Sequence, residues 1–431
     1  MKRLVVCCDG TWKSSKDPRI SNIEKIARAI TTRPDDDTIQ LVHYCSGVGT
    51  GGTWYDRLLG GALGRGLDIN LIDAYRFLAL NYEPGDEIYV FGFSRGAYTA
   101  RSLVGMIARV GLLTGDNLAC PPASSSNLLD DALEAYRAQG ASREAQQRAI
   151  HKYTYGFATP DGRPRITFIG VFDTVGALGI PGVTRSNYAF HDVELSDQVD
   201  CARQALAIDE RRLTFEPCVW EKKADPATDL QQVWFEGVHS DIGGGLDRSA
   251  PSDLTLAWMV SEAAGQGLRF DRDRLPGART ERPTVEDVCY APHNSLTWAY
   301  RFVNVLRLCL GVRRHGAQVQ RHKGQSRLLE VAKDPATPMY LARPALTRWK
   351  GQARRAKQAK NISWWAELIG SGALEDRVVA IPELGENLDL LPIATSDFEV
   401  IGQNPAPARD VTPGSRVTGC GEHADVPVRT P

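Results

Sequence analysis

The feature that most constrains the fold is a serine between two glycines, placed where an apolar run gives way to a helical pattern. Residues 87–91 predict a buried strand, Gly92-Phe93-Ser94-Arg95-Gly96 follows at once, and apolar residues over 97–110 repeat at helical spacing. A strand that bends through G-x-S-x-G into a helix exposes the serine hydroxyl at the helix N-terminus. We therefore predict Ser94 as a nucleophile and the Arg95 N–H as an oxyanion donor. A glycine-flanked turn without function is the alternative.

The rest of the first half alternates short apolar runs with helical patterns, which is typical of a parallel sheet covered on both faces. The sequence predicts strands at residues 4–8, 38–44, 165–172 and 232–238, and helices that begin at residue 22 and span 68–82. The expected fold class is α/β, with an α/β-hydrolase-like, mostly parallel sheet between helices and a helical C-terminal extension.

Composition shifts divide the chain into three parts. Residues 1–265 are predicted to form the catalytic core, with an insertion at about 116–150 that is polar and helix-prone. Residues 266–402 read as a helical, basic C-terminal extension or lid, and 403–431 as a disordered tail without an apolar period.

A serine needs a base, and the base needs an acid to orient it. His239 and Asp173 each end a predicted strand, so the carboxyl edge of the sheet would bring both to Ser94. His191 and His293 are the fallback bases. Asp241, two residues from His239, is expected to support the site, whereas Asp209 is expected in a structural ion pair.

Asp9-Gly10-Thr11 follows the first strand and faces the same edge of the sheet. The backbone amides of Gly10 or Thr11 are candidates for the second oxyanion donor, beside Asp9 as a supporting residue. A plain turn cap is the competing interpretation of this segment.

Six motifs carry a resemblance to a known family. They span Cys8–Trp12, Gly47–Thr50, Gly92–Ala97, Phe172–Val175, Ala205–Arg211 and Trp234–Gly245, in that order. Together they resemble the uncharacterised α/β-hydrolase family (a domain of unknown function) that includes phospholipase effectors of bacterial type VI secretion, over roughly residues 3–265. The resemblance places the family's catalytic Ser, Asp and His on Ser94, Asp173 and His239. The secreted phospholipases carry a membrane-associating region beyond this core, which has no obvious counterpart here.

These features predict a serine esterase or lipase, phospholipase-like, that cleaves carboxylic esters through an acyl-enzyme, with no metal or organic cofactor. One alternative is a catalytically silent binding module on the same fold. Another is a metal-dependent phosphoesterase that uses Asp9, His239 and Asp241. A haloacid-dehalogenase-like phosphatase would need an aspartate where this chain has Cys7.

Charge and apolar runs bear on partners and location. The net charge of −1 gives no attraction to nucleic acid, so the expected partner is an ester or lipid molecule. Cationic residues interleaved with tryptophan over 343–365 suggest peripheral contact with anionic membrane, against the simpler reading of a solvated helix face. The first apolar run is too short for a signal peptide, no stretch is long enough to span a membrane, and nine cysteines form no C-x-x-C pair. We expect a cytoplasmic protein, with export by a signal-independent system as the alternative.

Overall fold

A single eight-stranded sheet organises the molecule, and all its neighbouring strands run parallel. The strand order is β12-β11-β10-β8-β6-β3-β1-β2. The strands are β1 (Lys2–Cys8), β2 (Ile39–Cys45), β3 (Glu87–Phe93), β6 (Ile166–Phe172), β8 (Val199–Ala207), β10 (Asp229–Phe235), β11 (Met339–Ala342) and β12 (Val378–Val379). The α/β class predicted from the sequence is confirmed.

The computed structural model describes residues 1–10, 19–34, 36, 38–47, 61–121, 127–155, 162–175, 194–212, 215–220, 222–223, 227–247, 249–275, 292–298, 300–301, 304, 327, 339–351, 360–372, 375–379 and 381. Within these residues, no helix combines the length and the apolarity needed to cross a bilayer.

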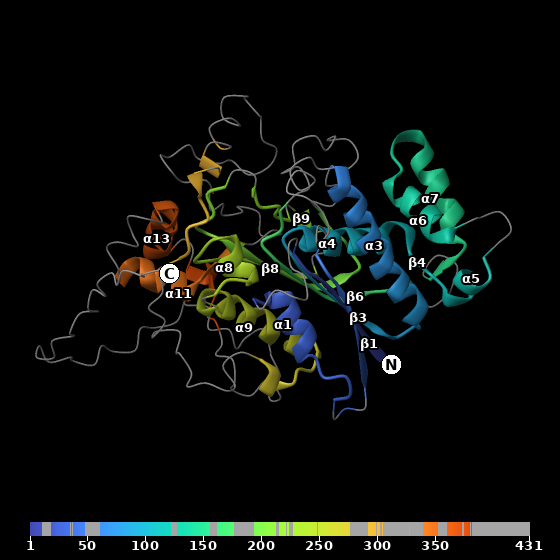
Figure 1. The fold of residues 1–431 in the computed structure, drawn as a ribbon, viewed down its shortest axis with the longest axis horizontal. Helices are drawn as coiled ribbons and strands as arrows, with labels where there is room; N and C mark the ends of the chain where they lie inside the picture. Colours follow the sequence, from blue (N-terminus) through green and yellow to red (C-terminus); the bar gives the residue numbers. More distant parts are fainter. Residues whose placement is uncertain are drawn as a thin grey trace, which may run out of the picture.

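Helices cover both faces of the sheet because its central strands are apolar on both sides. Alternate residues of β1 show this: Leu4 and Val6 belong to one buried cluster, and Val5 and Cys7 to the other. The first cluster packs under α3 (Gly61–Asn81) and α4 (Arg95–Val110), the second under α1 (Asn22–Ala29) and α9 (Ala250–Gly265). Figure 1 shows these two layers on opposite sides of the strands.

The predicted insertion near 116–150 is a small helical group beside α4. It contains α5 (Gly115–Ala119), α6 (Leu128–Arg137), the 3-10 turn Gly140–Ser142 and α7 (Arg143–His151). The pair β4 (Leu112–Leu113) and β5 (Thr154–Tyr155) closes its base, and β7 (Glu194–Leu195) pairs with β9 (Lys222–Lys223) elsewhere. Leu128 and Ala132 of α6 join the cluster under α4, so the group is part of the same core.

The C-terminal region is not purely helical, because it adds β11 and β12 to the edge of the main sheet. Its helices are α11 (Arg343–Gly351) and α13 (Ser363–Gly370), with 3-10 turns at Arg272–Arg274, Lys360–Ile362 and Glu375–Arg377. Residues of α11, of α13 and of the turn Lys360–Ile362 pack with Trp234 of β10 in a third buried cluster. The two strands are short and lie outside the apolar alternation of the first half, which is why the sequence did not reveal them.

Within the stretch 343–365, where membrane contact is expected, two of the residues behind that prediction face the protein. Trp365 is fully buried in the third cluster, and the guanidinium of Arg348 is paired with Glu236 at 2.9 Å. These two residues serve to attach α11 and α13 to the sheet. Residues 352–359, which hold three of the cationic side chains, lie outside the described residues.

Candidate active site

The bend after β3 holds Ser94 in a backbone conformation that few residues adopt. Ser94 has φ 58° and ψ −119° and stands directly before α4. In the described part of the chain, Ser94 and Asp173 are the only residues other than glycine that have a positive φ. Such strain persists where the surrounding structure enforces it, and it is concentrated at functional sites.

The two glycines of the motif are required by close backbone approaches. A Cβ on Gly92 would lie 2.6 Å from Ala97 Cα, and one on Gly96 would lie 2.2 Å from the Cys8 carbonyl oxygen. The first approach is between β3 and α4, the second between α4 and the end of β1. Glycine at both positions therefore lets the helix begin against the carboxyl edge of the sheet, as the motif predicts.

Pairing of β3 with β6 sets Asp173 next to Ser94. Phe93 is in register with Phe172, and the Ser94 N–H donates to the Phe172 carbonyl at 3.1 Å. Ser94 and Asp173 thus follow adjacent strands at the same level. Asp173 is fully buried and Ser94 is 7% exposed.

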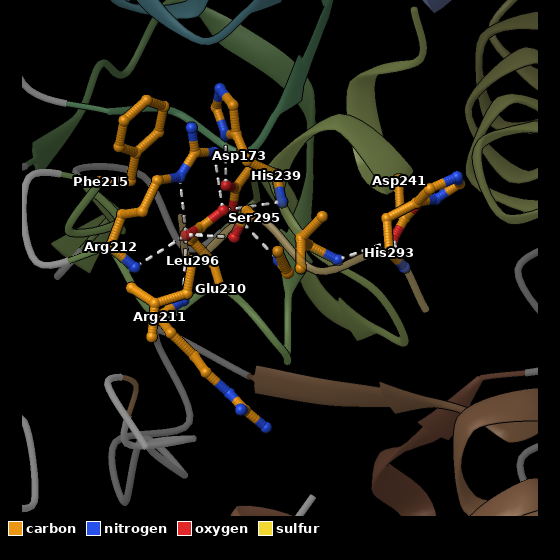
Figure 2. A network of polar contacts seen from close by, with 12 residues as sticks. Asp173, Glu210, Arg211, Arg212, Phe215, His239, Asp241, His293, Ser295 and Leu296 are labelled. Carbon is orange, nitrogen blue, oxygen red and sulfur yellow. Dashed lines mark hydrogen bonds and ion pairs between the residues drawn. The ribbon is translucent and has the colours of Figure 1, made fainter. Parts of the chain in front are cut away.

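His239 meets Asp173 from the other side of the edge. It follows β10 and is the first residue of α8 (His239–Gly243), and its Nδ1 lies 2.6 Å from Asp173 Oδ2. Such a contact can hold an imidazole in one tautomer and orientation. Figure 2 shows the pair side by side.

Aromatic rings fix the plane of the imidazole. The His239 ring centroid lies 4.8 Å from that of Phe93 and 4.9 Å from that of Phe215. Phe93 is the residue before Ser94, so this contact brings the imidazole to the elbow. In the described part of the chain, Ser94 Oγ makes no hydrogen bond to His239 and does not cap α4. Catalytic hydrogen bonds commonly tighten only when substrate is bound.

Neighbouring charge keeps Asp173 ionised, and burial keeps His239 neutral. Burial opposes ionisation of Asp173, but the Arg327 guanidinium and His239 outweigh it and hold the pKa of Asp173 well below its usual range. Burial lowers the pKa of His239, although Asp173 acts in the opposite direction. A neutral imidazole next to a carboxylate is the form that accepts a proton from a serine.

Glu210, after β8, anchors the loop that faces His239. Its carboxylate accepts from Arg212 Nε and Nη2, at 3.0 and 2.8 Å. It also accepts from the His239 N–H at 3.2 Å and from Ser295 Oγ at 3.0 Å. Burial acts against ionisation, but Arg212 lowers the pKa of Glu210 to about 2. Figure 2 shows these contacts converging on one carboxylate.

Asp241 supports a second histidine rather than His239. Its Oδ2 accepts the Val238 N–H at 3.0 Å and the His293 N–H at 3.1 Å, and its Oδ1 contacts His293 Nδ1. In Figure 2 this pair is set apart from Asp173. Its geometry ties the backbone around 293 to α8. His191, the other fallback base, lies outside the described residues.

Asp9 is a buried structural carboxylate. Its Oδ2 accepts from Ser21 Oγ and Tyr44 Oη, both at 2.6 Å, and its Oδ1 accepts from the Gly10 N–H at 2.6 Å. These contacts join the end of β1 to α1 and β2, as the interpretation of a turn cap expects. The Gly10 N–H is therefore engaged, and Thr11 lies outside the described residues.

Asp209, which follows β8, accepts the Gly237 N–H at 2.7 Å.

The arrangement gives no support to a metal site at Asp9, His239 and Asp241. Each of these side chains is already bound by protein groups, as described above. Among the described residues, no group of three His, Cys, Asp or Glu side chains is placed to hold a metal ion.

Two residues central to this geometry escaped the sequence analysis. Glu210 lies in the fifth family motif, Ala205–Arg211, where the sequence makes it look like one of several surface charges. Arg327 lies in a basic stretch without any motif, so nothing local marks it. The importance of each residue is visible only from its buried partner in the fold. That partner is the His239 N–H for Glu210 and the Asp173 carboxylate for Arg327.

Comparisons with known proteins show what the chain is similar to. A model of the catalytic domain of Tle1-like phospholipase effectors of the type VI secretion system matches residues 2–262 of the chain, more than half of its length. An uncharacterised protein of Saccharomyces cerevisiae is 30% identical over 234 residues, which are 50% of this chain and 32% of the yeast protein. The match thus spans about a third of the yeast relative's own length.

Two solved structures are similar in part. The crystal structure of an uncharacterised protein from Pseudomonas aeruginosa has 17% identity and a TM-score of 0.36, over 66% of this chain and 48% of that one. The structure of the Tle1 effector bound to the VgrG spike from the type VI secretion system has 19% identity and a TM-score of 0.31, over 57% and 51%.

Proposed function

Because this chain belongs to the family of Tle1-like phospholipase effectors, by its catalytic domain at residues 2–262, we propose that it is a serine hydrolase that cleaves lipid or phospholipid acyl esters. The observation that carries the proposal is the Asp173–His239 pair, 2.6 Å apart, at the strand-to-helix bend that presents Ser94. Family membership supports lipid ester hydrolysis in general, and the residue roles are our assignment.

In the proposed reaction His239 acts as a base and then as an acid in each of two half-reactions. Its Nε2 takes the proton of Ser94 Oγ as that oxygen attacks the ester carbonyl carbon, and it returns the proton to the departing alcohol. The acyl group is then bonded to Ser94. A water molecule, deprotonated by His239, attacks the same carbon, and the fatty acid leaves as Ser94 recovers its proton. Asp173 stabilises the imidazolium formed in each half.

The negative charge on the carbonyl oxygen needs donors at the helix N-terminus. The Arg95 N–H, at the first position of α4, is the donor that the elbow geometry favours. A second comes from the Gly10 or Thr11 amide. Since the Gly10 N–H is bonded to Asp9 Oδ1, Gly10 would have to exchange that contact for the substrate oxygen.

A panel of p-nitrophenyl esters and phospholipid vesicles tests the proposal. We expect the wild type to hydrolyse at least one of them and Ser94→Ala to lose at least roughly 10³-fold in kcat/KM without a change in Tm. Ser102→Ala, on the same helix and 8% exposed, is the matched control and should keep full activity. Equal rates for wild type and Ser94→Ala would refute the assignment.

One observation favours a second candidate, a silent lipid-binding module: the described structure has no hydrogen bond between Ser94 Oγ and His239. The same panel separates the two. A silent module would bind vesicles without releasing fatty acid, and its binding would be the same in Ser94→Ala.

A further inference from the structure

An arginine from outside the family-matched residues reaches the catalytic acid. Arg327 lies 65 residues beyond the end of that match, at residue 262, yet it is only 4% exposed and sits against Asp173. Its Nη1 lies 2.6 Å from Asp173 Oδ1 and its Nη2 lies 3.0 Å from Oδ2. Two parallel bonds of this kind fix the plane of a carboxylate as well as its position.

Arg327 and His239 share the carboxylate between them. Oδ2 faces both His239 Nδ1 and Arg327 Nη2, and Oδ1 accepts the Ala207 N–H at 3.0 Å besides Arg327 Nη1. Without the guanidinium, the Ala207 N–H would be the one other donor, among the described residues, that holds Asp173 beside the imidazole. The orientation of the Asp173 carboxylate toward His239 is thus set largely by Arg327.

The guanidinium is itself anchored at the edge of the sheet. Its Nη1 also donates to the Ala207 carbonyl at 2.9 Å and its Nη2 to the Phe215 carbonyl at 2.6 Å. The Asn361 side-chain amide donates to the Ile208 carbonyl at 3.0 Å, beside the end of β8. The C-terminal region is therefore built into the catalytic centre.

We propose that Arg327 is a positioning residue of the hydrolase, which orients Asp173 toward His239 and balances its negative charge. This inference rests on the proposed function. It gives the C-terminal region a role in the chemistry in addition to its role in packing.

The charge balance has a measurable consequence. Among the described residues, the charged groups that act on the Asp173–His239 pair are Arg327 on the acid and Glu210 with Arg212 after β8, whereas Asp241 contacts His293 beside α8. When Arg327 loses its charge, the pair binds an additional proton more readily, whichever of its two members carries that proton. The acid limb of the pH profile must then move to higher pH, because the protonated pair cannot accept the proton of Ser94.

The experiment follows the rate of fluorophosphonate labelling at Ser94, and of ester hydrolysis, from acid to neutral pH. We expect Arg327→Met to shift the acid limb upward by about one pH unit or more. Arg327→Lys keeps the charge but loses the paired bonds, so its rate should fall about tenfold or more while its acid limb stays within about 0.3 unit of the wild type. Guanidinium ion added to Arg327→Ala should restore labelling.

Arg203→Met is the matched control for the loss of a buried arginine. Arg203 is 2% exposed and bridges Glu262 and Asp229, away from the elbow. Its replacement should lower Tm and leave the acid limb unmoved. An Arg327→Met limb that coincides with the wild type, and no rescue by guanidinium, would overturn the inference. Wild-type protein that is not labelled at Ser94 would instead overturn the proposed function, so the two failures are distinct.

Discussion

At the scale of single residues, the carboxyl edge of the sheet is an array of buried carboxylates, each held by several donors. Asp9, Asp173, Glu210 and Asp241 are between 0 and 2% exposed. Their donors are backbone N–H groups, hydroxyls, imidazoles and guanidinium groups. Because a buried charge without such partners is strongly destabilising, each donor has a role that can be tested by substitution.

The first prediction concerns the pH dependence of the reaction. Burial lowers the pKa of His239, and only the neutral imidazole can act as the base. With a lowered pKa, the imidazole stays neutral to a lower pH than an ordinary histidine does. We therefore expect kcat/KM to stay near its maximum through the pH range in which an ordinary histidine becomes protonated. A stopped-flow pH profile checks this. An acid limb above the ordinary histidine value would contradict the environment described for His239.

The second prediction concerns Glu210 and stability. Its folded pKa of about 2 is below the ordinary value of 4.5, so its contribution is complete above 4.5 and is lost as pH falls toward about 2. Urea unfolding at pH 7 should show Glu210→Gln less stable by about 3 kcal/mol. The difference should shrink between about pH 4.5 and 2.

Glu83→Gln is the control for that measurement, because the Glu83 side chain is 76% exposed and pairs with Lys2 at the surface. Its effect should be within about 0.5 kcal/mol. A Glu210→Gln protein as stable as the Glu83→Gln protein at pH 7 would show that the contacts of Glu210 are dispensable.

At the scale of elements, the elbow depends on how closely α4 approaches the ends of β1 and β3. Gly96→Ala places a Cβ 2.2 Å from the Cys8 carbonyl oxygen, which is backbone and cannot turn aside. We predict a loss of more than about 2 kcal/mol in unfolding free energy and a loss of Ser94 labelling. Gly115→Ala, whose nearest neighbour is the Ala79 carbonyl oxygen at 3.8 Å, should change stability by less than about 0.5 kcal/mol.

The sequence predicted the elements that have a clear apolar period. Strands β1, β2, β3, β6 and β10 and the helices α1 and α3 lie where the patterns placed them, although α3 begins earlier, at Gly61. Strand β8 was missed because Asp200, Arg203 and Gln204 interrupt its apolar residues. Arg203 and Gln204 are nevertheless buried, since Glu262 and Gln232 satisfy them from neighbouring elements. Such partners are long-range, and periodicity does not show them.

At the scale of the whole molecule, the C-terminal region adds two strands to one edge of the sheet and supplies contacts to the site. β11 and β12 extend the sheet beyond β10, Ser295 binds Glu210, and Arg327 binds Asp173. Motif and strand order placed Ser94, Asp173 and His239 at one edge. Arg327 could not be placed this way, because its position depends on the path of the chain after residue 275.

The fourth prediction tests that dependence by truncation. A chain that ends at residue 265 lacks β11, β12 and Arg327, so it should be inactive and should unfold at a lower temperature than the full chain. A chain that ends at Ile381 keeps every contact described here and should retain activity and Tm. Full activity in the shorter chain would show that the core works without the C-terminal region.

The central claim is that Ser94 is activated by His239, and covalent labelling tests it most directly. Wild type, Ser94→Ala and His239→Ala are treated with a fluorophosphonate, and the modified peptide is identified by mass spectrometry. The account predicts one adduct, on Ser94, in the wild type, none in Ser94→Ala, and labelling slowed at least roughly 10³-fold in His239→Ala with folding intact. An unlabelled wild type, or labelling of Ser94 at the same rate without His239, would contradict it.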